Sequence, residues 1–199
     1  MSIKINYSNK VSNKSLVNHV LFVDEKFNIN VLKKYLSNSE FSYINDLLKI
    51  SDFKKNLFVF EVNSKKKIVL ISIKKDLKSF DIENLGSEFY ERINYGKNSE
   101  YFINSDSVIG KYENFIGHFL HGIKLKSYEF NKYKTKKETR LISINVLGNK
   151  NKPSVQNQLK FKALEEGIFY ARDLVSEPGN ILHPDEYAKR LNSLRKDGL

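Results

Sequence analysis

The side chains in this sequence that could do chemistry are few, and one histidine pair is the first to consider. His118 and His121 are the only two histidines close together in the chain. On a helix, residues three apart share one face, so both imidazoles could bind one metal ion. A metal site needs further ligands, and the nearest carboxylate, that of Glu113, lies more than one helical turn before His118. We therefore favour a half-buried helix face over a metal site.

Other catalytic patterns are missing from the sequence. No glycine-rich phosphate loop follows a strand, and there is no GxSxG turn for a nucleophilic serine. Ser176 has no evident base, although His183 follows seven residues later. The absence of cysteine excludes a thiolate metal site, a cysteine nucleophile and a disulfide scaffold. From these patterns we name no catalytic residue and no metal ligand, while a nucleotide pocket at the strand ends stays open.

A basic segment between residues 124 and 140 is the other candidate for binding. The chain has a net charge of +11, and this segment interleaves cations with Tyr128, Phe130 and Tyr133. Aromatic rings among cations can stack bases while the cations hold phosphates. Only 5 of the 34 basic residues are arginines, however, and arginine supplies the two-pronged contact to phosphate and guanine. We favour a solvated turn, and name as possible nucleic-acid contacts Lys132, Lys134, Lys136 and Lys137.

The composition predicts a folded, soluble and cytoplasmic protein. A chain of 199 residues with 40% hydrophobic residues can bury a core without disulfides. The first residues contain no apolar signal segment. The longest apolar runs, 57–62 and 67–73, are far short of the roughly 20 residues that cross a membrane. We therefore expect no membrane partner.

The elements that must position these side chains follow from hydrophobic periodicity, which predicts strands that alternate with helices. Strands are expected at residues 2–7, 16–23, 57–62, 67–73, 100–104 and 140–147, the third and fourth paired as a hairpin. Helices are expected at residues 31–50 with a break near 37–39, 81–95 with Gly96 as the C-cap, 108–126, and 156–175. This order predicts an α/β fold, in which helices flank both faces of a mostly parallel or mixed sheet.

A boundary is predicted near residue 150, because residues 149–153 are polar and contain a proline. The helix that follows leads out of the domain. Leu164, Ile168 and Val175 share one stripe of that helix but have few partners within 199 residues. We therefore expect part of this stripe to be exposed.

Two segments resemble one family. Residues 122–137, GIKLKSYEFNKYKTKK, are similar to the helix end and basic loop that close the amino-terminal domain of the leucyl (cytosol) aminopeptidases. Residues 171–188, ARDLVSEPGNILHPDEYA, are similar to the segment linking that domain to the catalytic one, where the family usually reads ARDLxNxPxNxxxP. Ser176 replaces the usual asparagine, while Pro178, Asn180 and Pro184 keep their register.

The resemblance implies an amino-terminal macro-like α/β domain at 1–150, then a linker helix and the start of a truncated catalytic domain at 151–199. The family removes amino-terminal residues from peptides with two divalent ions, Mn or Zn, whose ligands lie in the carboxy-terminal domain. This fragment is accordingly expected to bind no metal and to be inactive alone. The implied partners are its own catalytic domain, peptide substrates and further copies in a homo-hexamer. Linker or interdomain positions are Arg172, Asp173, Pro178, Asn180 and Pro184.

A second function belongs to a different class: an autonomous basic α/β module that binds nucleic acid or a nucleotide-like ligand. The two need not exclude each other, because some bacterial members of the resembled family also bind DNA. Several phosphate contacts would make the affinity fall steeply with salt. DNA affinity that stays constant between about 50 and 200 mM salt would contradict this electrostatic binding.

Overall fold

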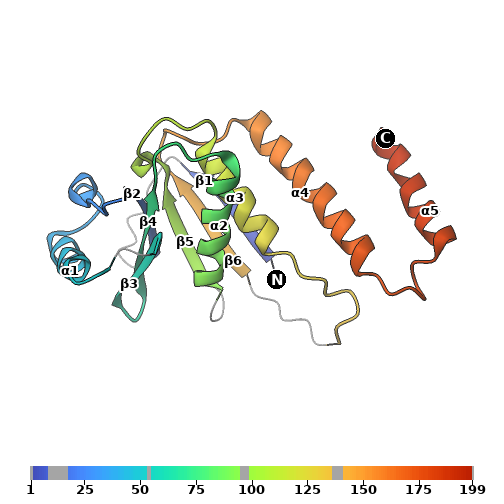
Figure 1. Cartoon of the computed structure of the whole chain (residues 1–199), viewed down its shortest axis with the longest axis horizontal. Coiled ribbons are helices and arrows are strands. Elements are labelled where there is room, and N and C mark those ends of the chain that lie inside the picture. Colours follow the sequence, from blue (N-terminus) through green and yellow to red (C-terminus); the bar gives the residue numbers. More distant parts are fainter. Residues whose placement is uncertain (1, 9–17, 53–54, 95–98, 136–140, 199) are drawn as a thin grey trace.

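The computed structural model describes residues 2–8, 18–52, 55–94, 99–135 and 141–198 (Figure 1). The elements are, in chain order, β1 (Ser2–Ser8), β2 (Asn18–Asp24), η1 (Asn30–Leu32), α1 (Asn38–Lys49), β3 (Leu57–Asn63), β4 (Lys66–Ile73), α2 (Ser79–Ile93), β5 (Ser99–Asn104), η2 (Ser105–Ser107), α3 (Phe115–Lys126), β6 (Leu141–Leu147), α4 (Val155–Ser176), α5 (Pro184–Ser193) and η3 (Leu194–Asp197).

The described strands form one sheet in the order β1-β6-β5-β2-β4-β3. Neighbours are parallel except β3 and β4, which form the predicted antiparallel hairpin at one edge. Because successive side chains on β2 point to opposite faces, Val20 and Phe22 enter one core cluster and Leu21 and Val23 enter the other. The α/β prediction with a mixed sheet covered on both faces is confirmed.

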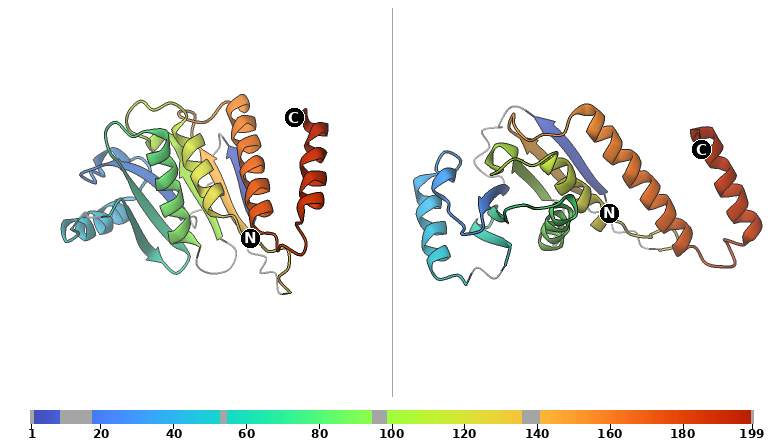
Figure 2. Two further views of the ribbon diagram at one scale, coloured as in Figure 1. Left: turned by 45° about the vertical axis from the view of Figure 1, so that its right-hand side comes forward. Right: turned by 45° about the horizontal axis from the view of Figure 1, so that its top comes forward.

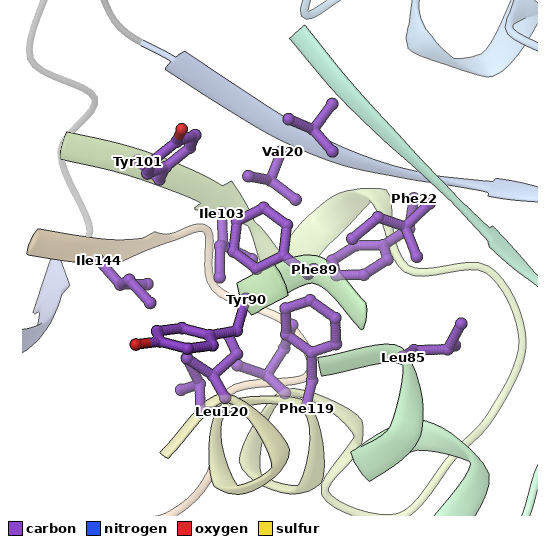
Figure 3. Packing of buried hydrophobic residues seen from close by; sticks show 14 of the residues in the cluster. Val20, Phe22, Leu85, Phe89, Tyr90, Tyr101, Ile103, Phe119, Leu120 and Ile144 are labelled. Carbon is purple, nitrogen blue, oxygen red and sulfur yellow. The ribbon is translucent and has the colours of Figure 1, made fainter. Parts of the chain in front are cut away.

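Helices α2 and α3 cover one face, and α1 covers the other (Figure 1). On the first face, the Phe119 ring lies 5.4 Å from the Phe22 ring and 5.6 Å from the Phe89 ring, measured between centroids (Figure 3). Two glycines allow α2 and α3 to approach closely. A Cβ on Gly122 would stand 1.9 Å from the carbonyl oxygen of Glu83, and one on Gly86 would stand 2.1 Å from that of Phe119.

Two helix predictions need correction. The helix expected at 108–126 begins only at Phe115, because Gly110 and Asn114 have positive φ values of 95° and 52° that interrupt a right-handed helix. The helix expected at 31–50 is a short 3-10 turn followed by α1. Ser37 caps α1 together with Glu40, which confirms the predicted break. Gly96, the predicted C-cap of α2, lies outside the described residues.

Helix α4 leaves the sheet region along α3, and α5 lies beyond it, on the side away from the sheet (Figure 2). No residue of α4 or α5 is buried. Leu164 is 46% exposed and Val175 is 87% exposed, so the expectation of an exposed stripe is confirmed.

Candidate functional site

The end of α4 is attached to the last turn of α3 and to the segment that follows it through two of the predicted linker residues. Arg172 donates from Nη1 to the carbonyl oxygen of Leu125 at 2.6 Å, and its guanidinium lies 5.5 Å from the centroid of the Tyr128 ring. Asp173 accepts a hydrogen bond from the Tyr128 hydroxyl at 2.6 Å. Both charged side chains therefore bind within this chain. A role between domains stays a prediction for both.

The other predicted linker residues reverse the chain. The carbonyl oxygen of Pro178 accepts from the amides of Ile181 and Leu182 at 2.9 and 3.0 Å. Pro184 begins α5, where the missing N–H of proline leaves no helical bond unmade. Asn180 lies between them and is exposed. The turn lets α5 run back alongside α4 (Figure 2).

Between these two features lies a carboxylate that the sequence analysis missed. Glu177 is the C-cap of α4, and its side chain is only 1% exposed. It accepts hydrogen bonds from Lys132 Nζ and the Tyr133 hydroxyl, and from Arg190 Nη1 at 2.8 Å. We call these four residues the Glu177 cluster. It joins the segment after α3, the end of α4 and the last turn of α5.

The electrostatics of the cluster favour the ionised carboxylate. Hydrogen bonds from Lys132, Tyr133 and Arg190 lower the pKa of Glu177 from 4.5 to about 2. The same bonds raise the pKa of Lys132 and that of Tyr133. An acid at a helix carboxyl end opposes the helix dipole. In the sequence, Glu177 directly follows the predicted helix 156–175 and precedes Pro178. An acidic residue at this position is therefore a sequence signal that could have indicated a cationic partner.

Two of the four lysines proposed for nucleic acid lie in the described residues, and their contact with nucleic acid stays a prediction. Lys132 pairs with Glu177, while Lys134 is exposed and donates its backbone amide to Asn131. Lys136 and Lys137 lie outside the described residues.

Two of the interleaved aromatic rings, Tyr128 and Phe130, are half-buried, while Tyr133 is 49% exposed. The Tyr128 ring lies 5.3 Å from the Phe169 ring, and the Phe130 ring lies 5.8 Å from the Tyr133 ring, between centroids. Rings that stack bases must present an open face, so the half-buried Tyr128 and Phe130 favour the turn over a nucleic-acid surface.

The histidine pair lies where α4 packs on α3. His118 Nδ1 is 2.8 Å from Glu83 Oε1, and His121 Nδ1 is 3.2 Å from Glu165 Oε1. The Phe161 ring contacts both imidazoles, at 5.0 and 5.2 Å between centroids. Each histidine is thus paired with a different carboxylate. In the part of the chain that the structure describes, no three or more His, Cys, Asp and Glu side chains form a group suited to a metal ion.

Open α/β sheets bind ligands at the carboxyl ends of their strands, and at the end of β6 the backbone amides that could do so are bound by the chain itself. The Asp106 carboxylate accepts from the backbone amides of Asn149 and Lys150 at 2.9 and 2.7 Å. Successive amides of this kind are the groups that hold a phosphate in many nucleotide sites. Their occupation by Asp106 speaks against a nucleotide-like ligand at this turn.

Within the described ranges, no helix has the length and apolar character needed to cross a membrane. No family model matches the chain.

Among curated proteins, the chain is similar to several bacterial ones named probable cytosol aminopeptidase. The probable cytosol aminopeptidase of Bradyrhizobium sp. (strain BTAi1) is 39% identical over 82 residues, which are 39% of this chain and 16% of that protein. The probable cytosol aminopeptidase of Rhodopseudomonas palustris (strain BisA53) is 30% identical over 144 residues, 67% of this chain and 28% of that protein. The matches fall in the amino-terminal part of the relatives. The chain therefore spans less than a third of their length.

Among solved structures, a mutant of tomato leucine aminopeptidase has the same fold, with a TM-score of 0.70 at 16% identity. The likeness covers 98% of this chain and 42% of the tomato protein. The bottromycin maturation enzyme BotP in complex with Mn follows with a TM-score of 0.59 at 11% identity, over 91% of this chain and 36% of BotP.

Proposed function

This chain is related in sequence and fold to the amino-terminal part of the leucyl (cytosol) aminopeptidases, and from that relationship we propose that it is the non-catalytic amino-terminal part of such an enzyme. The longer protein would remove amino-terminal residues from peptides. The chain of 199 residues would be inactive alone. The observation that carries this proposal is the partial match: nearly the whole of this chain aligns with less than half of the tomato enzyme.

The exposed face of α4 is the surface that we assign to the remainder of the longer protein. An apolar groove of about 340 Å³ opens there, beside the Glu177 cluster. It is lined by Tyr128, Ile168, Ala171, Arg172, Val175 and Ser176. Apolar side chains that are regularly spaced and uncovered on one helix face favour a protein partner. The relatives are several times longer than their match to this chain, and in the longer protein the remainder would cover this face.

The metal chemistry would reside in that remainder. Two divalent ions, Mn or Zn, would activate water and polarise the peptide carbonyl there. The described residues do not fit such a centre, because His118 and His121 are each held by a separate carboxylate and both contact Phe161. The Mn in the BotP complex supports manganese as one of the two choices. A cytoplasmic location, which the relatives' name supports, and a homo-hexamer complete the proposal.

The deciding experiment compares two forms of the protein. The native product is isolated from its own cells, its mass is measured, and its hydrolysis of leucine p-nitroanilide is assayed with Mn²⁺ and with Zn²⁺. We expect a chain of roughly twice this length, which would carry a second domain of ordinary size, to be active. The 199-residue chain, assayed under the same conditions, should be inactive. Hydrolysis by the 199-residue chain, or a longer native product that is inactive with both metals, would contradict the proposal.

A further inference from the structure

We propose that the Glu177 cluster is a latch that holds α5 beside the end of α4, with segment 128–133, which we call the strap, as the part that comes from the α/β domain. The latch joins three separate segments of the chain. Lys132 and Tyr133 come from the strap, Glu177 caps α4, and Arg190 comes from α5. The strap would thus help to position α5, and this is the role that we assign to it instead of contact with nucleic acid.

The carboxylate of Glu177 is the common acceptor that connects the three segments. The Glu177 side chain is 1% exposed, and each of its three donors comes from outside α4. Lys132 lies 45 residues before Glu177, and Arg190 lies 13 residues after it. Hydrogen bonds between ionised groups are the stronger class, so a carboxylate with two cationic donors holds its partners tightly.

Polar contacts have to position α5, because it has no buried residue. Tyr187 and Leu191, its large hydrophobic residues, are exposed. The Tyr170 hydroxyl of α4 also donates to the carbonyl oxygen of Arg190 at 2.9 Å, so α4 contacts α5 at the residue that binds Glu177. A helix without a buried face opens locally at low cost. Breaking the contacts at Arg190 would therefore release α5.

The latch depends on the negative charge of Glu177, because two cations bind this carboxylate. With it, Lys132 and Arg190 share a common anion. Without its charge, these two cations face each other, and among the described carboxylates Arg190 keeps Glu186 of its own helix, which accepts from Nε at 3.1 Å. Like charges in proximity repel. Neutralising Glu177 should therefore separate the strap from α5 rather than merely weaken one bond.

Hydrogen exchange of the 199-residue chain tests the latch in variants of matched chemistry. Glu177→Gln removes the charge and keeps the shape. Glu186→Gln is the control, because it also deprives Arg190 of a carboxylate but leaves the strap untouched. We expect Glu177→Gln to speed amide exchange in 184–193 and in 128–133 together, by roughly tenfold or more, with 141–147 in the sheet unchanged. The control should leave 128–133 at the parent rate.

The proposal is overturned if Glu177→Gln leaves exchange in 184–193 at the parent rate, or speeds α5 without the strap. If this variant also speeds exchange in 141–147, the whole domain has been destabilised and Tyr133→Phe decides. That variant removes one donor and keeps both cations. It must speed exchange in 128–133 and 184–193 with the sheet unchanged, and parent rates there would refute the latch. Because the readout does not involve peptide hydrolysis, failure of the latch and failure of the proposed function are distinguishable.

Discussion

Glu177 shows how one side chain acquires a role from its surroundings. Alone at the carboxyl end of α4 it would oppose the helix dipole. With Lys132, Tyr133 and Arg190 as donors it becomes an ionised acceptor whose pKa is lowered to about 2. Arg172 and Asp173, in contrast, have simpler contacts. Arg172 donates to the carbonyl oxygen of Leu125, and Asp173 accepts from the Tyr128 hydroxyl.

The lowered pKa of Glu177 predicts a dependence on pH. A carboxyl group whose folded pKa is below its usual value of 4.5 stabilises the fold above that pH, and the stabilisation is lost as pH falls toward 2. The parent should therefore melt at a higher temperature than Glu177→Gln at pH 6, and the difference should shrink steadily between pH 4.5 and 2. Thermal melting by circular dichroism over this range measures it. A constant difference would mean that the charge of Glu177 does not stabilise the fold.

Among the helices, the close packing of α2 on α3 depends on residues without side chains. A Cβ on Gly122 would collide with the backbone of Glu83 in α2, whereas a Cβ on Gly167 of α4 would meet nothing within 4 Å. Glycine in a helix is otherwise unfavourable relative to alanine. The same substitution should therefore have opposite effects at these two positions.

Gly122→Ala is expected to destabilise the chain by about 1–3 kcal/mol, because the two helices must move apart. Gly167→Ala is expected to stabilise it by up to about 1 kcal/mol through helix propensity. Urea unfolding of both variants and the parent measures the changes. Equal effects at the two positions would show that the contact between α2 and α3 is looser than the structure gives.

As a whole, the described part of the chain is a sheet with helices on both faces and one long helix, α4, whose outer face is exposed. On this face Val175 is 87% exposed, so its side chain contributes little to the stability of the 199-residue chain. Phe119, in contrast, is fully buried between α2, α3 and the sheet (Figure 3). The two side chains should therefore respond differently to the presence of the longer protein.

Val175→Ser should change the stability of the 199-residue chain by less than about 0.5 kcal/mol. In a longer native product that covers α4, the same substitution should cost about 1–2 kcal/mol more, as for a buried aliphatic residue. Phe119→Ala, the control, should destabilise both forms by about 3–5 kcal/mol. Denaturant unfolding compares the forms. Equal small effects of Val175→Ser in both would show that no domain covers this residue.

The uncovered helix also predicts an observable in the isolated chain. Amides at 168–174 should exchange faster than those of the buried sheet, and an apolar dye should bind to the exposed groove. Hydrogen exchange and dye fluorescence measure the two effects. Full protection of 168–174 would contradict an open α4 face.

The sequence was enough to predict the strands, the hairpin, most helix bounds and the family resemblance. Periodicity, turn residues and motifs depend on residues that are close together in the sequence. The start of α3 could not be predicted, since its late beginning depends on Asn114 adopting a left-handed conformation. The Glu177 cluster also could not, because Lys132 reaches Glu177 across 45 residues. Their meeting depends on how α4 packs on α3, and that packing is the sum of many contacts, such as Phe161 against the two histidines, which no single stretch of sequence contains.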